Sequence, residues 1–279
     1  MLLKIILTII IIAAIIALVT FSYVIVSHYS SVDYSMNLLK NPIILENSKS
    51  ISKILNQTYH KPEIIPDKVQ KNLKEFASDY ELKMYNDKDG KEFLEKYFID
   101  RVAEKYDFLT GAHKADLLRY CLLYINGGVY ADIKTEFVKP LSLLVQNSSG
   151  VSDKPLIYIV NSLHEPITVY NGFMAAPANQ KFFLDLINFI VQKSSLLPAF
   201  SYTYFIKDAY QKLKNDLVNG DVKQGFNAGN RNNYYVMEEV TSKNAENCPD
   251  GLDRYHLCSW IMDGDKKIIK TRYSDYPWH

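Results

Sequence analysis

Charged residues of opposite sign recur over a short stretch in the middle of the sequence. Asp116 and Arg119 are three residues apart in an apolar segment with a helical pattern, so they share one face of the expected helix. Two glycines follow, and the next segment, "VYADIKTEF", has the composition of a strand that places Asp132 and Lys134 on one side. From the residues alone, this pattern predicts either a surface ion pair beside a tight turn, or a site where two carboxylates and two cations converge.

The elements that must position these residues alternate between strand and helix from Ile51 onward. Strands are expected at residues 52–59, 81–86, 127–132 and 155–162, and helices at residues 69–80, 90–98, 113–126 and 180–194. This alternation predicts an α/β fold in one domain, with ligands bound outside the carboxyl ends of the strands. The Gly127-Gly128 pair is expected to end a helix and to reverse the chain tightly.

The composition excludes several classes of protein. With 23% charged and 48% hydrophobic residues the chain is expected to fold, and a net charge of +1 without a long basic run predicts no nucleic-acid partner. The three cysteines form no CxxC pair, which argues against a structural zinc site. Cys248 and Cys258 could close a small loop in an oxidising compartment, leaving Cys121 in an apolar helix.

The amino-terminal segment is apolar over the length that a membrane helix needs. Residues 5–26 carry no charge, and at about 1.5 Å per residue they cross a hydrocarbon layer of roughly 30 Å. A cleaved signal peptide would have a shorter apolar core and a small-residue cleavage site. We therefore expect a short tail at residues 1–4, an uncleaved signal anchor at 5–26, a stem at 27–49 and a catalytic domain at 50–279.

The central motif resembles the sugar-binding region, containing a DXD motif, of retaining glycosyltransferases of family 32. It is more distantly similar to that of the large glucosylating toxins. The matching residues are Lys114-Ala115-Asp116, Arg119-Tyr120, Gly127-Gly128, Tyr130, Asp132, Thr135 and Lys139-Pro140-Leu141. The segments "ISKILNQTY", "YELKMYND" and "VYNGFMAA" resemble flanking parts of the same family, in the expected order.

The resemblance implies a GT-A-type nucleotide-sugar-binding fold with a mixed central sheet, preceded by the transmembrane helix. It implies that Asp116 and Arg119 hold the transferred sugar and that Asp132 contacts the ribose and a divalent metal ion. The other positions that it implies for donor binding are Gln57, Thr58, Asp87, Tyr130 and Asn171. Trp260 is a candidate lid residue or, equally, a core residue. If Asn56 lies at this site, its sequon is expected to carry no glycan, because a glycan would block the donor.

The departure from the family pattern that bears on metal binding is at Lys134. Lys134 stands where the family has the second acid, normally a ligand of Mn²⁺ or Mg²⁺, and an ammonium group cannot ligate a metal ion. Three alternatives follow. Asp132 and a carboxyl-terminal group such as His256 or Asp263 complete the metal shell; Lys134 pairs with the donor's diphosphate; or the protein binds donor without turnover.

The resemblance implies a retaining glycosyltransferase that moves a hexose from a UDP- or GDP-linked donor to a glycan or glycolipid acceptor. We expect attack on the face from which the diphosphate departs, in a single-pass membrane protein of the Golgi or endoplasmic reticulum with a lumenal catalytic domain. The alternatives are a nucleotide-sugar-binding pseudoenzyme or partner subunit of an active transferase, and a purely structural membrane protein.

Overall fold

The computed structural model describes residues 37–40, 49–146, 153–162, 167–192, 203–242, 258–273 and 275–276. Backbone contacts divide the chain into two compact units, residues 1–37 and 38–279, and all elements below belong to the second. The expected tail, anchor and most of the expected stem lie outside the described residues. Of the helices described here, none combines the length and the apolar character needed to cross a bilayer.

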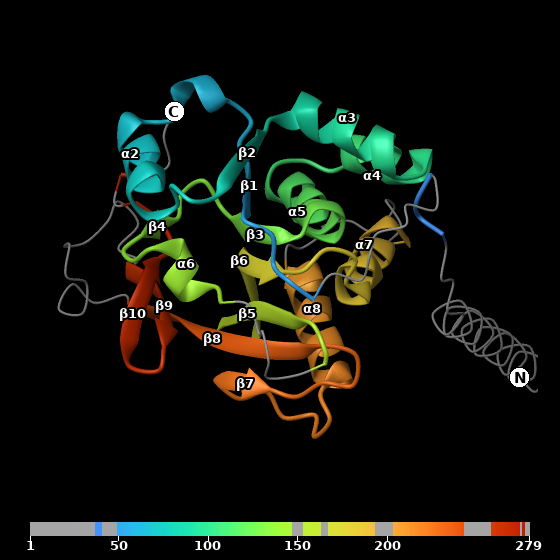
Figure 1. The fold of residues 1–279 in the computed structure, drawn as a ribbon. Coiled ribbons are helices and arrows are strands. Elements are labelled where there is room, and N and C mark those ends of the chain that lie inside the picture. Colours follow the sequence, from blue (N-terminus) through green and yellow to red (C-terminus); the bar gives the residue numbers. More distant parts are fainter. Residues whose placement is uncertain are drawn as a thin grey trace, which may run out of the picture. The chain divides into compact units, whose positions relative to one another are not determined.

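A single mixed sheet runs through the second unit (Figure 1). The strands are β1 (Ile54–Thr58), β2 (Glu81–Tyr85), β3 (Gly128–Ala131), β4 (Glu136–Phe137), β5 (Leu156–Ser162), β6 (Thr168–Ala176), β7 (Gly225–Asn227), β8 (Asn233–Ser242), β9 (Cys258–Asp263) and β10 (Lys266–Lys270). They are ordered β2-β1-β3-β6-β5-β8-β9-β10-β4, with β7 paired to β8. The mixed α/β architecture expected from the sequence is confirmed.

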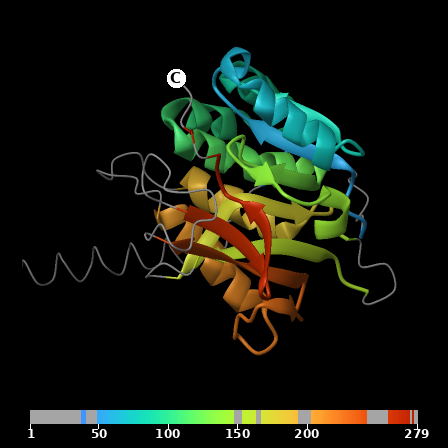
Figure 2. The ribbon, with the colours of Figure 1, turned by 90° about the vertical axis from the view of Figure 1, so that its left-hand side faces the viewer.

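The direction of the strands changes across the sheet. The strand β1 is parallel to β2 and β3, whereas β3 and β6 are antiparallel. The pair β5 and β8 is parallel again, and β8, β9 and β10 run antiparallel side by side, coloured orange to red in Figure 2. The strands β2, β1 and β3 are adjacent and parallel, so their carboxyl ends lie side by side at one edge of the sheet.

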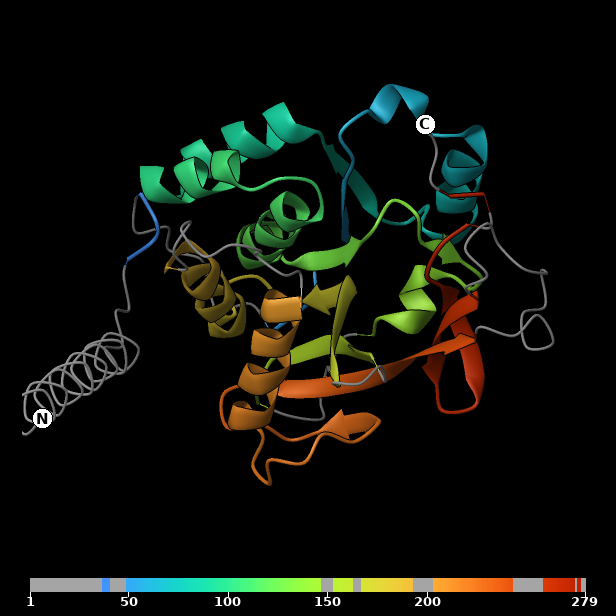
Figure 3. The same ribbon diagram turned by 180° about the vertical axis from the view of Figure 1, so that it is seen from behind.

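The helices are η1 (Pro62–Ile64), α2 (Asp67–Phe76), α3 (Asp87–Tyr97), α4 (Asp100–Phe108), α5 (Ala112–Asn126), α6 (Leu141–Leu144), α7 (Lys181–Gln192) and α8 (Thr203–Asp216). Helix α5 packs against β1, β3 and α7, while α8 packs against β6 and α7 (Figure 3). Helix α2 packs against β4 instead. The two faces of the sheet are thus covered by different groups of helices.

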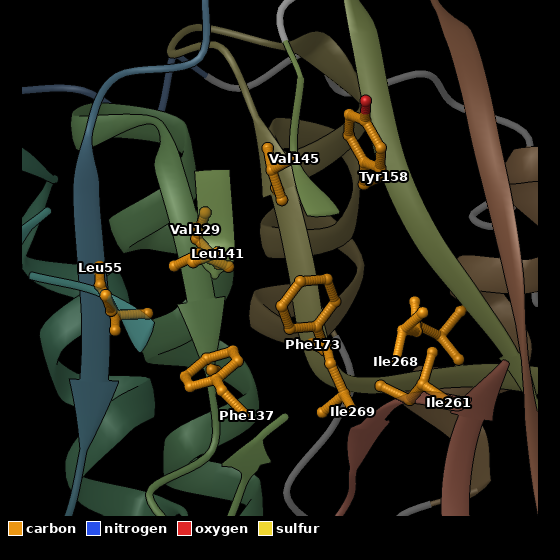
Figure 4. Packing of buried hydrophobic residues seen from close by; sticks show 14 of the residues in the cluster. Leu55, Val129, Phe137, Leu141, Val145, Tyr158, Phe173, Ile261, Ile268 and Ile269 are labelled. Atoms are coloured by element: carbon orange, nitrogen blue, oxygen red, sulfur yellow. The ribbon is translucent and has the colours of Figure 1, made fainter. Parts of the chain in front are cut away.

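A cluster of buried apolar side chains lies on the α2 face of the sheet (Figure 4). Leu55, Val129 and Phe173 come from the adjacent strands β1, β3 and β6, and Ile261 and Ile269 extend the cluster to β9 and β10. Because side chains alternate along a strand, Asn56 and Tyr130 point from the same strands to the opposite face. That face carries the polar groups of the site.

The turn between α5 and β3 shows why two glycines are needed. Gly127 and Gly128 have φ angles of +61° and +80°, a backbone conformation that other residues rarely adopt. A Cβ atom at Gly128 would lie 2.3 Å from the carbonyl oxygen of Ile54 in β1. The chain therefore leaves α5 in close contact with β1 and enters β3 directly, as the sequence predicts.

The compact unit begins earlier than the expected domain boundary at residue 50. Leu38 is buried, its carbonyl accepts a hydrogen bond from the Ile99 amide at 2.8 Å, and Leu39 forms a β-bridge with Phe98. Residues 38–40, which the sequence assigns to the stem, are therefore part of the folded unit. Cys121 is a buried free thiol, whereas Cys248 lies outside the described residues, so the expected Cys248–Cys258 bridge is not described.

Candidate functional site

A cleft of about 780 Å³ opens at the carboxyl ends of β1, β2 and β3. Thr58 ends β1, Asp87 follows β2, and Asp132 follows β3, so each strand delivers polar groups to the cleft. The remaining lining residues come mainly from the chain after β1, from α4 and α5, and from the carboxyl-terminal segment. They are Tyr59, His60, Lys61, Ile64, Tyr85, Tyr106, Gly111, Ala112, Lys114, Ala115, Leu118, Arg119, Ile133, Lys134 and Tyr276.

One buried guanidinium group joins both carboxylates. Arg119 Nη2 lies 3.3 Å from Asp116 Oδ1 and 3.4 Å from Asp132 Oδ1, so helix α5 and the end of β3 meet at this side chain. The Arg119 guanidinium also stacks over the Tyr130 ring, at 4.7 Å from its centroid. The two carboxylates and the arginine that the sequence places on separate elements therefore converge in the structure.

Asn171 on β6 completes the arrangement from the interior of the protein. Its side-chain amide donates to Asp116 Oδ1 at 2.8 Å, while its own carbonyl oxygens, of the side chain and of the backbone, accept from Arg119 Nη1 at 2.8 and 2.7 Å. Asn171 is completely buried and does not line the cleft. It positions the charged pair, whereas the resemblance implied direct donor binding.

Asp132 is held by a second set of contacts on the cleft side. The Tyr130 hydroxyl donates to Asp132 Oδ1 at 3.1 Å and lies 2.9 Å from the Thr58 hydroxyl. The backbone amide of Asp132 donates to the Gly172 carbonyl at 2.8 Å. Burial alone would raise the pKa of Asp132, but Arg119, Lys134 and the Tyr130 hydroxyl outweigh it, so this pKa lies below its ordinary value.

Asp116 has the opposite electrostatic character. Its side chain is completely buried, and burial raises its pKa despite the neighbouring Arg119 and Asn171. Within the described part of the chain, Asp116 Oδ2 has no hydrogen-bond partner. A buried carboxylate oxygen without a partner is costly, which suggests that this position is kept for a role other than stability.

Lys134 reaches the same cleft from the loop after β3. Its ammonium nitrogen lies 3.5 Å from Asp132 Oδ2 and 5.9 Å from the centroid of the Tyr276 ring. Both Lys134 and Tyr276 line the cleft. The cleft therefore presents a carboxylate and an ammonium group side by side where the family pattern has two acids.

These residues do not fit a divalent cation. Such ions bind oxygen ligands, and the ammonium group of Lys134 would repel a cation placed at Asp132. In the part of the chain that the structure describes, no group of three or more His, Cys, Asp or Glu residues could hold a metal ion. Asp263 instead accepts a hydrogen bond from the Tyr235 hydroxyl, and His256 lies outside the described residues.

The other expected donor-binding residues are divided between the cleft and the interior. Thr58 and Asp87 line the cleft, and Asp87 pairs with Lys114 at 3.1 Å. Gln57 is completely buried beside the cleft-lining Thr58 but does not line the cleft, and neither of its amide atoms has a partner among the described residues. Trp260 lies in β9 and is not among the cleft residues, so the structure does not bring the expected lid residue to the site.

Asn56 is buried under the cleft as a structural residue. Its amide donates to the carbonyls of Gly127 and Val129, at 3.1 and 3.2 Å, and its side-chain oxygen accepts from Asn126 at 2.9 Å. A side chain in this position has no room for a glycan, which agrees with the expectation for its sequon. The asparagine instead joins β1 to the turn that precedes β3.

Several cleft residues lie outside the motifs that predict the site. His60 and Lys61 follow β1, Tyr106 lies in α4, and Tyr276 belongs to the carboxyl-terminal segment. The helix α4 itself was not expected. Lys61 could have been found from its position just after the "NQTY" segment, whereas nothing local connects Tyr276 to residues near position 130.

Comparison with known proteins shows a match to one family over part of the chain. Residues 20–152 match the family model described as "Glycosyltransferase sugar-binding region containing DXD motif". This match confirms the resemblance predicted from the motifs. It covers the cleft residues from Thr58 to Lys134 but not Asn171 or Tyr276.

Two curated yeast proteins are similar to the chain. "Inositol phosphoceramide mannosyltransferase 3" of Schizosaccharomyces pombe is 25% identical over 182 residues, which are 62% of this chain and 46% of the relative. "Initiation-specific alpha-1,6-mannosyltransferase" of Saccharomyces cerevisiae is 33% identical over 101 residues, which are 35% of this chain and 20% of the relative. The chain thus spans less than half the length of either protein.

A solved structure titled "PaToxG Glycosyltransferase" also matches, with 18% identity and a TM-score of 0.41. The match covers 59% of this chain and 70% of that structure.

Proposed function

We propose that this chain, whose residues 20–152 match the model of a glycosyltransferase sugar-binding region, transfers a hexose from a nucleoside-diphosphate sugar to a glycan or glycolipid. The observation that supports this most directly is the meeting of Asp116, Arg119 and Asp132 under a cleft at the carboxyl ends of three parallel strands. Ligands of α/β proteins bind outside this edge. A GT-A-type fold is part of the proposal.

The size and charge of the cleft suit such a donor. A volume of about 780 Å³ lies in the range of small-molecule sites. Four cations, Lys61, Lys114, Arg119 and Lys134, line it against two carboxylates, Asp87 and Asp132. This balance favours an anionic ligand such as a diphosphate, whereas the carboxylates provide acceptors for sugar and ribose hydroxyls.

The names of both yeast relatives favour mannose as the transferred hexose and therefore GDP-mannose as the first donor to test. In the retaining reaction that we propose, the bond between the sugar C1 and the diphosphate oxygen breaks, and its electron pair leaves with the diphosphate. The acceptor oxygen forms the new bond on the same face of C1. The acceptor's hydroxyl proton passes to the departing diphosphate.

The cleft residues have separate tasks in this reaction. Asp132 accepts hydrogen bonds from the donor, and its low pKa keeps it ionised at neutral pH. Arg119 contacts both carboxylates from the cleft wall, and Asp116, which is completely buried behind the cleft and held by Asn171, keeps the Arg119 guanidinium in place. Stabilising the developing charge on the diphosphate is the largest task, and the cations of the cleft are placed to perform it.

The membrane location is also a proposal. The uncharged segment at residues 5–26 supports a single-pass anchor, which would place the cleft in the lumen of the Golgi or endoplasmic reticulum. A membrane-bound transferase would meet glycolipid and glycan acceptors there. Glycosylation mapping of the full chain in microsomes would test this orientation.

The test of the function is release of nucleoside diphosphate by the purified full-length chain, with GDP-mannose and a panel of UDP- and GDP-hexoses. We expect turnover with at least one donor. Asp132→Asn should lower kcat/KM by about 100-fold or more, because a group that acts on the reacting sugar is lost. As a matched control, Asp79→Asn removes an exposed aspartate that pairs with Lys53, and it should leave turnover unchanged.

If none of the donors binds to the chain, the proposed function is wrong. Tight binding without turnover would favour the pseudoenzyme instead, for which the replacement of the second acid by Lys134 is the specific observation. The two results are separated by measuring binding and turnover on the same preparation.

A further inference from the structure

Lys134 sits in a loop that the rest of the protein holds in place. The turn after β3 is closed by the Thr135 amide, which donates to the Asp132 carbonyl at 2.9 Å. The Lys134 carbonyl in turn accepts from the Tyr273 amide at 3.0 Å. With 29% of its side chain exposed, Lys134 is neither a free surface lysine nor a buried one. Its ammonium group can therefore meet a ligand without first moving.

The carboxyl-terminal segment that holds Lys134 is itself tied to helix α2. Asp275 forms an ion pair with Lys68 of α2, and the Lys68 ammonium lies 5.1 Å from the centroid of the Tyr273 ring. The Tyr276 amide donates to the Tyr273 carbonyl at 3.2 Å, which places the Tyr276 ring in the wall of the cleft. Three separate parts of the chain thus cooperate to fix one ammonium group.

The ammonium group of Lys134 lies where a positive charge would help to bind a phosphate. Lys134 lies 3.5 Å from Asp132 Oδ2, beside the carboxylate that the family pattern makes a metal ligand. An ammonium group is a compact charge with three donors, and lysine binds phosphates in this way in other proteins. The charge already present at Lys134 opposes the entry of a second cation at Asp132.

We propose that Lys134, held by Tyr273 and Tyr276, binds the diphosphate of the donor directly, so that donor binding in this chain needs no divalent cation. The inference rests on the proposed function, since it assigns a residue to the donor's diphosphate. When the bond between the sugar C1 and the diphosphate oxygen breaks, Lys134 stabilises the charge that the leaving diphosphate takes up. Tyr276 acts as a positioning residue for the lysine.

The first experiment measures binding of GDP and UDP to the full-length chain by calorimetry, in EDTA and in Mn²⁺. We expect the nucleotide that binds to show the same affinity in both, within about twofold. Lys134→Met should weaken binding about 10- to 100-fold, the effect of losing one charge-assisted hydrogen bond. Lys134→Arg, which keeps the charge, should retain most of the affinity.

The matched control is Lys181→Met, which also removes a lysine paired with an aspartate. Lys181 lies 2.5 Å from Asp185 on α7, and neither residue lines the cleft. This variant should bind GDP or UDP as the unmodified chain does. Tyr276→Ala should weaken binding less than Lys134→Met, and combining the two should add little, because both act through the same ammonium group.

A gain-of-function variant sharpens the test. Lys134→Asp restores the pair of acids, and we expect it to bind the nucleotide only when Mn²⁺ is present. This result cannot come from misfolding, since a misfolded variant would not respond to the metal.

The outcomes distinguish a failure of the role proposed for Lys134 from a failure of the proposed transferase function. Binding that requires Mn²⁺ in the unmodified chain and is unaffected by Lys134→Met overturns the role of Lys134 and leaves the proposed transferase intact. No binding of GDP, UDP or any sugar donor, with or without metal, overturns the proposed function itself.

Discussion

At Arg119, a single side chain determines how two carboxylates behave. Its guanidinium contacts Asp116 and Asp132 at 3.3 and 3.4 Å, yet the pKa values of the two acids are shifted in opposite directions. Asp116 is completely buried, and burial prevails there. Asp132 is also near Lys134 and accepts from Tyr130, and these partners prevail over burial. Equal contacts to one cation therefore produce different chemistry because the surroundings differ.

The opposite shifts predict opposite pH dependences of stability. Because the pKa of Asp116 is raised, Asp116 makes its full contribution to the free energy of unfolding below about pH 3.8, its ordinary pKa. This contribution is lost as the pH rises through the raised pKa. The lowered pKa of Asp132 means that its contribution is present above about 3.8 and is lost as the pH falls through the lowered pKa.

We therefore expect Asp116→Asn to gain stability relative to the unmodified chain as the pH rises from 4 to 7. As the pH rises toward 4, Asp132→Asn should lose stability relative to the unmodified chain. Above pH 4 this difference should change little. Urea denaturation across this pH range measures both differences. Parallel pH profiles for the two variants would contradict the assignment of the two carboxylates.

The element that places Asp132 is the antiparallel pair of β3 and β6. Ala131 pairs with Phe173, and the Asp132 amide then donates to the Gly172 carbonyl at 2.8 Å. Gly172 is also where a side chain would collide with the site, because its Cβ would lie 2.8 Å from Asp132 Oδ2 and 2.4 Å from the Tyr170 hydroxyl. The absence of a side chain on β6 thus leaves space for the carboxylate.

Gly172→Ala should therefore displace the Asp132 carboxylate and lower kcat/KM at least tenfold, as misplacement of a catalytic group by about 1 Å does. Both kcat and KM of the Gly172→Ala variant are measured with the donor that shows turnover. As control, Gly220→Ala meets nothing within 4 Å and costs only the strain of its φ of +70°, roughly 1 kcal/mol. Full activity of the Gly172 variant would show that Asp132 tolerates movement.

At the scale of the whole molecule, the folded unit includes residues that the sequence assigns to a stem. Leu38 is 1% exposed, and its carbonyl and the Lys40 amide bond to Ile99 and Tyr97 at 2.8 and 3.1 Å. These contacts attach the start of the unit to the end of α3 and the beginning of α4.

A chain that begins at Leu38 should therefore unfold in urea like the same unit in the full-length protein. A chain that begins at Ser50 should be less stable by about 3 kcal/mol, the combined effect of losing one buried leucine and two hydrogen bonds. Circular dichroism during urea titration measures both. Equal stability of the two truncated chains would mean that Leu38 to Lys40 only lie against the domain.

The sequence by itself determined the parts of the site that lie on consecutive elements. Asp116 and Arg119 share a helix face, two glycines turn the chain, and Asp132 and Lys134 follow one strand, so local periodicity and turn chemistry suffice to predict them. The same motifs predicted the resemblance to a glycosyltransferase family, which the match of residues 20–152 confirms. The mixed sheet was also expected, although the helix at Asp100–Phe108 was not.

Only the tertiary structure decided which distant residues complete the site. Asn171 reaches Asp116 across 55 residues of sequence because β6 pairs with β3, and Tyr276 enters the cleft because β10 returns antiparallel to β4. It also placed Trp260 in β9, away from the cleft residues. Local patterns specify the direction in which a side chain points along its own element. Which elements become neighbours depends on long-range strand pairing and packing, and no short segment of sequence contains that information.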